Sequence, residues 1–251
     1  MGRSMKKAWR SKPNILVRGL VKLASALGYT YARVPFSHPR KCNLCGYSGN
    51  FRHAGLYDIR PDALCLSCWS TDRERLFAIY VDRSGWTSND KEILHFAPEA
   101  NIVNRLKPAA KRYLTADLFS ERADVNWNIE QIPAEAGSFD AVICAHVLEH
   151  VDTEKALGEI NRVLRPGGRA LLMVPINEAL EKTYTDANIT TEDERYLHFR
   201  QPDHVRIIGR DFKDQVRAAG FLLEEFLAHP RDVVAHGLQI GEKVFVAIKP
   251  S

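Results

Sequence analysis

Phe139-Asp-Ala-Val-Ile-Cys-Ala-His-Val-Leu-Glu-His-Val151 is the stretch of this sequence that decides the fold. Apolar residues dominate its first half, as in a strand that is buried on both faces of a parallel sheet. The predicted strand spans residues 139–145 and ends at Ala145 and His146, and residues 147–150 are predicted to begin a helix. Open α/β sheets bind ligands outside the carboxyl ends of their strands. The stretch therefore predicts a central strand whose end, at His146, faces a ligand.

The chain from Glu92 onward alternates short apolar runs with amphipathic segments. This alternation predicts an α/β fold with a doubly wound, mostly parallel, seven-stranded sheet and crossover helices. No convincing helical pattern separates the last two strands, which predicts an antiparallel hairpin at one edge. Pro166, Gly167 and Gly168 are predicted to form a turn that ends one helix and starts a strand. The predicted strands span residues 93–96, 112–116, 124–127, 139–145, 170–174, 221–227 and 244–249.

Composition and charge narrow the class of protein. The 251 residues are 45% apolar and 26% charged, which excludes a disordered chain and a coiled coil. No stretch approaches the apolar length of a transmembrane helix, so no membrane-spanning segment is expected. The formal net charge is +4, yet no acidic residue precedes Asp58, and the first part of the chain is a basic arm. Such an arm can bind RNA or an anionic membrane surface, or it can be a solvated tail that keeps the protein soluble. Its charge alone does not distinguish these roles.

Residues 1–40 are predicted to form a basic amphipathic helix and a connector. Within this arm, residues 15–27 place apolar side chains near one helical face. Arg18 and Lys22 interrupt the apolar centre that a secretory signal needs, so a cytoplasmic protein is expected. Two roles stay open for the helix: peripheral contact with a membrane surface, or packing of its apolar face on the protein body.

Four cysteines form two Cys-x-x-Cys pairs, Cys42 with Cys45 and Cys65 with Cys68. This spacing is typical of a tetrahedral zinc site with four thiolate ligands. Two disulfides are disfavoured because the remaining cysteine, Cys144, stands alone and no secretion signal is expected. A catalytic zinc ion is disfavoured because four thiolates leave no open coordination position. We therefore expect a zinc ribbon with a structural Zn²⁺ ion.

Two stretches resemble the class I (type 11-like) S-adenosylmethionine-dependent methyltransferases. The stretch quoted above looks like the fourth strand of that family, and Glu159-Ile-Asn-Arg-Val-Leu-Arg-Pro-Gly-Gly168 looks like the helix and glycine turn before its fifth strand. The resemblance covers residues 92–249 and implies a Rossmann-like fold that binds S-adenosyl-L-methionine. The predicted domains are then a zinc ribbon with a linking helix at 41–90 and a methyltransferase domain at 91–251, with a lid insertion at 176–210.

The resemblance also assigns the cofactor contacts. Ala97 and Glu99 stand at glycine positions of the family's first loop, so this loop is expected to bind through side chains, with Glu99 holding the cofactor's amino group or acting as an acid at a helix start. Asp117 is expected to accept hydrogen bonds from both ribose hydroxyls. Asn128 stands in the adenine loop, where an amide oxygen can accept the adenine amino group or satisfy a local turn. The expected cofactor-binding residues are Phe96, Ala97, Glu99, Asp117, Asn128 and His146.

A narrower resemblance is to bacterial members of the family that combine a zinc ribbon, a motif like His95-Phe-Ala-Pro-Glu99, and a late segment like His204-Val-Arg206. The late segment lies in the predicted lid. Histidine suits proton removal near neutral pH, and arginine binds anionic groups bidentately. The expected catalytic residues are therefore His204 and His146 as candidate bases and Arg206 as a substrate contact, unless the lid residues only bond to one another.

These expectations combine into an S-adenosylmethionine-dependent methyltransferase that acts on oxygen or nitrogen of a small-molecule or glycan-type acceptor. The expected cofactors are S-adenosyl-L-methionine and structural Zn²⁺. The leading alternative is a ribosomal or transfer RNA methyltransferase whose ribbon and basic arm grip RNA. A second alternative is a noncatalytic binding module that has kept the fold.

Overall fold

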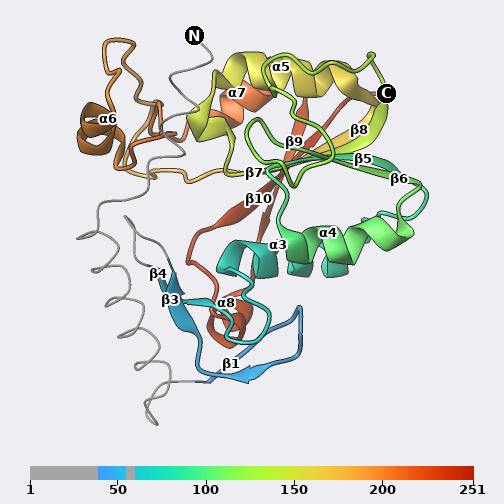
Figure 1. Cartoon of the computed structure of the whole chain (residues 1–251), viewed down its shortest axis with the longest axis vertical. Coiled ribbons are helices and arrows are strands. Elements are labelled where there is room, and N and C mark those ends of the chain that lie inside the picture. Colours follow the sequence, from blue (N-terminus) through green and yellow to red (C-terminus); the bar gives the residue numbers. More distant parts are fainter. Residues whose placement is uncertain (1–38, 55–59) are drawn as a thin grey trace. The chain divides into compact units, whose positions relative to one another are not determined.

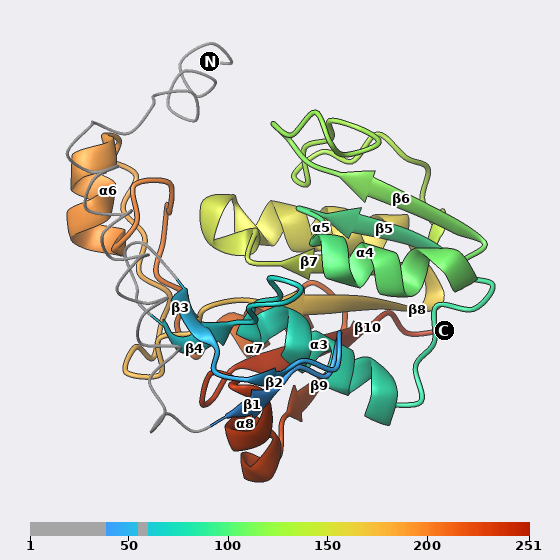
Figure 2. The same ribbon diagram turned by 60° about the horizontal axis from the view of Figure 1, so that its bottom comes forward.

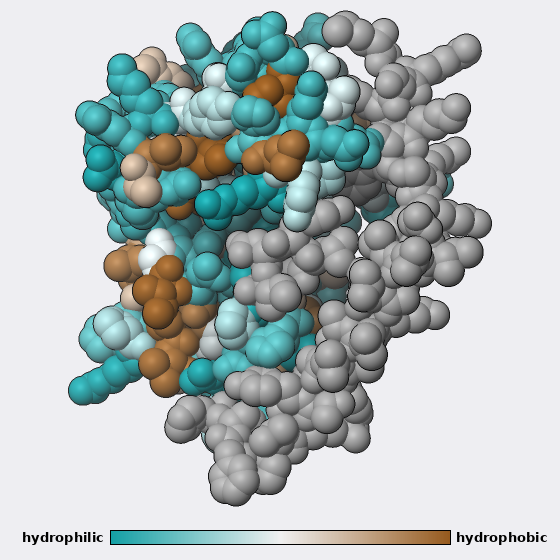
Figure 3. Space-filling view, turned by 90° about the vertical axis from the view of Figure 1, so that its left-hand side faces the viewer, coloured by the Kyte–Doolittle hydropathy of each residue, from teal (hydrophilic) through white to brown (hydrophobic). Residues whose placement is uncertain are grey.

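The computed structural model describes residues 39–54 and 60–251, so the predicted helix over residues 15–27 and nearly all of the 1–40 arm lie outside the described residues. Within the described part of the chain, no helix has the length and apolar character needed to cross a membrane. On the side shown in Figure 3, hydrophilic residues surround separate groups of apolar ones.

The chain divides into two compact units. One contains the described residues up to Arg75 together with Pro230–Gln239, and the other contains Leu76–His229 and Ile240–Ser251. The sequence-based domain boundary after residue 90 differs from this division. A late segment of the chain belongs to the same unit as the cysteines, which the sequence analysis did not predict.

The larger unit is built on one mixed sheet with the order β6-β5-β7-β8-β10-β9 (Figures 1 and 2). The first four strands of that order are parallel, and β10 pairs antiparallel with both β8 and β9. The predicted antiparallel hairpin at one edge is thus confirmed. The strands are β5 Glu92–Phe96, β6 Arg112–Ala116, β7 Phe139–Ala145, β8 Leu164–Met173, β9 Leu222–Leu227 and β10 Lys243–Ile248.

Among the described residues the sheet has six strands, and the prediction of seven is wrong at residues 124–127. There the chain makes only an isolated parallel bridge between Ala116 and Val125. The Asp124 carboxylate accepts hydrogen bonds from the Thr115 backbone N–H at 2.9 Å and from its hydroxyl at 2.8 Å. Because a side chain takes the N–H that a longer ladder would use, the pairing stops after one residue.

Helices cover both faces of the sheet: α5 and α7 lie on one face and α4 on the other (Figure 1). The apolar side chains of α5 pack with those of β7 and β8, and Phe212 and Val216 of α7 join the same core. The helices are α3 Asp72–Arg83, α4 Ala100–Leu106, α5 Thr153–Val163, α6 Glu192–Phe199, α7 Phe212–Ala218 and α8 Pro230–His236, with 3-10 turns η1 Lys107–Ala109 and η2 Leu148–His150.

Two local predictions need correction. Pro166, Gly167 and Gly168 lie inside β8 and do not form a separate turn, because α5 leads directly into this strand and Gly167 takes a positive φ of 75° within it. The connection between the last two strands also contains a helix, α8, which was not predicted. Seven residues are too few for a clear helical period in the sequence.

Candidate active site and cysteine cluster

The parallel strands β5, β6 and β7 end side by side. Phe96 is paired with Ala116 on one side and with Cys144 on the other. The residues that follow these strands are Ala97, Asp117 and His146, and Ala145, the last residue of β7, still pairs with Met173 of β8. The structure therefore brings three of the predicted site residues to one carboxyl edge, where open α/β sheets bind ligands.

The loop after β5 folds differently from the sequence-based expectation. Ala97 has a φ of 47°, which is the left-handed conformation that glycine adopts most easily. Its backbone N–H donates to the carbonyl of Ala116 at 2.9 Å, which holds the loop against the end of β6. The loop thus keeps a glycine-like backbone without glycine, at a cost of roughly 1 kcal/mol for the alanine.

Glu99 is positioned by a buried histidine. His95 is fully buried, with Nδ1 2.8 Å from the Tyr113 hydroxyl and Nε2 3.0 Å from Oε2 of Glu99. Glu99 occupies the N-cap position of α4, but its side chain makes no capping hydrogen bond there. Burial, followed by the charge of Glu99, raises the pKa of Tyr113, so this phenol stays protonated. The arrangement fixes a carboxylate beside the loop.

Asp117 is oriented by the turn that follows it. Its Oδ1 accepts the backbone N–H groups of Phe119 at 2.8 Å and of Ser120 at 2.7 Å. These bonds hold the carboxylate at the end of β6 and involve only one of its two oxygens. The geometry is compatible with a second acceptor role for Oδ2.

Asn128 lies in a local turn. Its Oδ1 accepts the Glu130 N–H at 2.9 Å, and its carbonyl accepts the Gln131 N–H at 3.0 Å. The turn role that the sequence analysis left open is therefore present in the structure. Any contact with an adenine amino group would use the second lone pair of the same oxygen.

His146 stands between two carboxylates. It has a φ of 54°, its Nδ1 is 3.2 Å from Oε1 of Glu149, and its Nε2 is 3.2 Å from Oε1 of Glu242. Burial opposes ionisation of Glu149, but the hydrogen bond from His146 and the nearby histidines outweigh it and lower the pKa of this carboxyl. A role of His146 as proton acceptor requires one of these two contacts to open.

His204 packs against η2. Its ring lies edge-on to that of His150, with 4.7 Å between the centroids, and the side chain is buried. Burial lowers the pKa of His204, which favours the neutral imidazole. The sequence analysis named His204 and missed Glu149 and His150, although both stand in the stretch that decided the fold.

Arg206 is engaged within the protein. Its Nη1 donates to the Thr153 hydroxyl at 3.0 Å, at the start of α5. Burial lowers the pKa of Arg206, opposed by the charges of Asp152 and Glu130. The structure thus shows an intramolecular contact for this arginine, next to η2.

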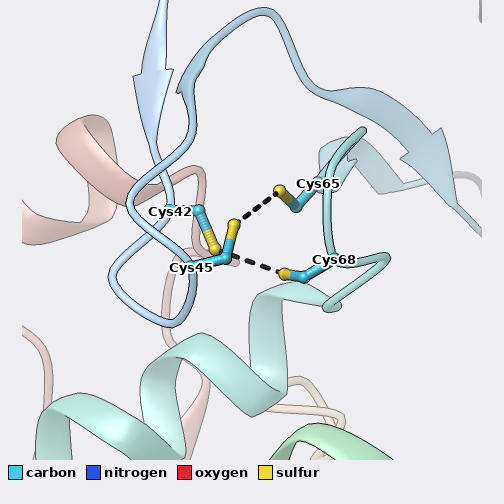
Figure 4. A group of neighbouring side chains, drawn as sticks. All are labelled: Cys42, Cys45, Cys65 and Cys68. Carbon is cyan, nitrogen blue, oxygen red and sulfur yellow. Dashed lines mark hydrogen bonds between the residues drawn. The ribbon is translucent and has the colours of Figure 1, made fainter.

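The four cysteines of the smaller unit converge on one point (Figure 4). The Sγ atoms of Cys42 and Cys68 are 3.7 Å apart, as are those of Cys45 and Cys65, and all four lie within 4.8 Å of one another. A tetrahedral site with Zn–S bonds of about 2.3 Å requires S···S separations of about 3.8 Å. The donor set therefore fits one Zn²⁺ ion.

Arg75 is a buried cation of the cysteine unit that donates to several backbone carbonyls. Its guanidinium donates to the carbonyls of Ser70 at 2.6 Å, Ala63 at 3.0 Å and Gly237 at 2.9 Å, while Nε donates to that of His236 at 2.8 Å. The last two carbonyls belong to α8 and the residue after it. Arg75 thus joins the cysteine region to a segment more than 150 residues away in the sequence, and it supplies positive charge near the thiolates.

Comparisons with known proteins agree with this geometry. Residues 95–172 match the family described as methyltransferase domain. The ubiquinone/menaquinone biosynthesis C-methyltransferase UbiE of Hahella chejuensis is 44% identical over 125 residues, which is 44% of this chain and 50% of that protein. UbiE of Methylobacterium nodulans is 39% identical over 127 residues, 47% of this chain and 50% of that protein. The chain spans at most about half the length of the curated relatives that it matches.

The similarity to solved structures concerns the fold. The YcgJ protein from Bacillus subtilis superposes with a TM-score of 0.50 at 14% identity, covering 71% of this chain and 99% of that one. Together with the strand order, this similarity shows a Rossmann-like methyltransferase fold, whose central sheet in the described residues is mostly parallel and has six strands.

Proposed function

We propose that the protein is an S-adenosylmethionine-dependent methyltransferase whose cofactor lies at the carboxyl edge of β5, β6 and β7. The observation that carries the proposal is the convergence of Ala97, Asp117 and His146 at this edge, and all three lie inside the matched methyltransferase region. The bound cofactor would supply an electrophilic methyl group on a sulfonium sulfur.

The donor side is assigned to residues whose positions are fixed before binding. Asp117, with Oδ1 held by the turn, presents its carboxylate to the ribose hydroxyls. Glu99, held by His95, accepts a hydrogen bond from the cofactor's amino group. Phe96 and Ala97 let the backbone lie close to the cofactor. Asn128 contacts the adenine. Such preorganised groups favour binding because little side-chain freedom is lost when the ligand arrives.

For the acceptor, the relatives favour carbon. Both UbiE proteins are named as C-methyltransferases of quinone biosynthesis, which does not support the oxygen or nitrogen of a glycan-type acceptor expected from the sequence. We infer a small aromatic acceptor of the quinol class. Its ring hydroxyl must lose a proton to make the ring carbon nucleophilic. We assign His204 or His146 as the group that accepts this proton. We assign Arg206 to positioning the residues next to η2.

We also propose that the cysteine cluster holds structural Zn²⁺. Four thiolates with one dication carry a net charge of about −2, and Arg75 lies among the groups that compensate it. Elemental analysis of the purified protein should find zinc that Cys42→Ser and Cys65→Ser variants lose. Zinc content unchanged in both variants would remove the ion from this site.

The function is tested by transfer of a radiolabelled methyl group from S-adenosylmethionine to reduced demethylmenaquinone, with a hydroxyl-bearing sugar and transfer RNA as parallel acceptors. We expect label in the quinol and its loss in Asp117→Ala. Label in the sugar or the RNA would contradict the acceptor class and retain the reaction. Failure to bind S-adenosylmethionine at all would contradict the reaction itself.

A further inference from the structure

A second group of metal-ligating side chains lies outside the cysteine cluster, at Glu149, His150 and His204. Each offers one ligand atom, and these atoms lie within 4.8 Å of one another. Two of the residues belong to η2, directly after β7, and the third belongs to the predicted lid. The Val205 backbone N–H donates to the carbonyl of Glu149 at 3.0 Å, so the main chain also fixes this part of the lid against η2.

Glu149 gives the first independent indication of a cation site. Its side chain is only 2% exposed, and Oε1 is 3.2 Å from Nδ1 of His146. Oε2 is buried and has no hydrogen-bond partner among the described residues. A buried polar atom without a partner costs roughly 1–3 kcal/mol. A metal ion between Glu149 and the two histidines would provide the missing partner.

His150 gives the second sign. Its Nδ1 is 3.1 Å from the backbone carbonyl of Asp203. A carbonyl can only accept a hydrogen bond, so this contact favours the tautomer with the proton on Nδ1, in which Nε2 carries the lone pair that can bind a metal. Metal-binding histidines commonly donate their other N–H to a backbone carbonyl in this way. The bond therefore sets His150 in the tautomer that a ligand needs.

We propose that Glu149, His150 and His204 bind a divalent transition-metal ion of the Zn²⁺ type. Two imidazoles and one carboxylate suit Zn²⁺ and its first-row neighbours, whereas Mg²⁺ and Ca²⁺ prefer oxygen ligands throughout. Three protein ligands leave a coordination position for water or another oxygen donor. The ion links the lid to the end of β7.

The proposal changes the role of His204. A metal ligand and a proton acceptor use the same lone pair, so the two roles exclude each other at one ring nitrogen. Metal binding does not depend on S-adenosylmethionine, and it can be measured without turnover. The test therefore separates this inference from the proposed methyl transfer.

The experiment adds Co²⁺ stepwise to the folded full-length protein, so that Co²⁺ replaces the bound metal, and follows the exchange by absorption spectroscopy. Co²⁺ in the cysteine cluster gives thiolate-to-metal charge-transfer absorption, whereas Co²⁺ bound by nitrogen and oxygen does not. We expect two bound equivalents, one with and one without this absorption. In His150→Ala, His204→Ala and Glu149→Gln, only the equivalent without charge transfer should weaken, by at least tenfold in dissociation constant.

The matched control is His198→Ala. His198 is an exposed histidine of the same lid whose Nδ1 is 2.8 Å from the Tyr184 hydroxyl, and its loss should leave both equivalents unchanged. Glu149→Gln keeps the volume of the side chain, so it remains informative if an alanine variant fails to fold. The proposal would be overturned by a single bound equivalent in the wild type. Wild-type affinity for the second equivalent in all three ligand variants would overturn it as well.

Discussion

The two carboxylate oxygens of Asp117 can be tested separately, because Oδ1 holds a turn and Oδ2 is the oxygen that we assign to the ribose. In Asp117→Asn the amide oxygen can still accept the Phe119 and Ser120 N–H groups, while the NH₂ group cannot accept a ribose hydroxyl. We expect at least a tenfold weaker affinity for S-adenosylmethionine, about 1.4 kcal/mol, with little change in stability. Isothermal titration calorimetry measures the affinity.

Asp214→Asn is the control for this prediction, since Asp214 is an exposed carboxylate on α7 and has no place at the carboxyl edge. Its affinity should equal that of the wild type. An Asp117→Asn variant with wild-type affinity would show that the ribose is held elsewhere.

Ala97 bears a backbone conformation that alanine disfavours. Ala97→Gly should be at least as stable as the wild type, with a gain of up to about 1 kcal/mol, because relief of the left-handed strain outweighs the extra freedom of glycine in the unfolded chain. Ala110 has an ordinary φ of −73°, so Ala110→Gly should lose about 0.5–1 kcal/mol. Urea unfolding measures both, and a loss at Ala97→Gly as large as at Ala110→Gly would contradict the assigned backbone.

At the scale of single residues, the sequence predicted the positions at strand ends better than the contacts between distant residues. Asp117 and His146 follow predicted strands, so their place at the carboxyl edge could be derived from the alternation of elements. Glu149 and His150 acquire their chemistry from His204, which only tertiary folding brings to them. No local pattern in the sequence reports that contact.

Among the elements, long apolar runs were predicted well, and short elements were not. β7 and β10 are buried along their length and matched their predicted positions closely, because apolar runs flanked by polar residues have few alternatives. The prediction of a strand at 124–127 failed because the Asp124 carboxylate accepts the Thr115 backbone N–H and ends the pairing there. α8 was missed because its place is set by contacts with the cysteine unit, including those of Arg75.

The amino ends of β5, β7 and β8 are tied by charge. Arg165 lies 2.8 Å from Asp140 and 3.4 Å from Glu92. Burial opposes ionisation of Asp140, but the Glu92 N–H and Arg165 lower the pKa of this carboxyl. A depressed carboxyl pKa stabilises the fold above the unfolded value of about 4, and this contribution disappears as the pH falls through the folded value.

Arg165→Ala should therefore destabilise the protein at neutral pH by about 1 kcal/mol or less, since Arg165 is 37% exposed and solvent screens the pair. The difference from the wild type should shrink in acid, as Asp140 becomes protonated in both proteins. Urea unfolding at a series of pH values measures it. A difference that grows toward acid pH has the opposite sign and would refute the ion-pair explanation.

Arg75 links α3 to α8 within the cysteine unit. Arg75→Ala removes charge-assisted hydrogen bonds to several buried carbonyls, so we expect a loss of at least about 3 kcal/mol in unfolding free energy. Zinc should also leave the variant faster, which a chromogenic chelator detects. Arg83→Ala, at the exposed end of the same helix, should change neither the unfolding free energy nor the rate of zinc release. If the two variants behaved alike, Arg75 would not have the role that we assign to it.

For the whole molecule, the two compact units do not follow one another along the chain, because each is built from two separate segments. The cysteine unit draws on the described residues up to Arg75 and on residues 230–239, while the six-stranded sheet of the larger unit is completed by β10 after that excursion. The sequence predicted a module followed by a domain, because linear boundaries are the only ones that composition can indicate. The excursion between β9 and β10 is a property of tertiary packing.

The central claim is that the carboxyl edge of this sheet binds S-adenosylmethionine although the loop after β5 lacks the usual glycines. Calorimetric titration of the folded, metal-loaded full-length protein tests it most directly. We predict one bound equivalent per chain, with a dissociation constant on the order of micromolar, and weaker binding in Asp117→Asn. A folded, metal-loaded protein that takes up no S-adenosylmethionine would contradict the account.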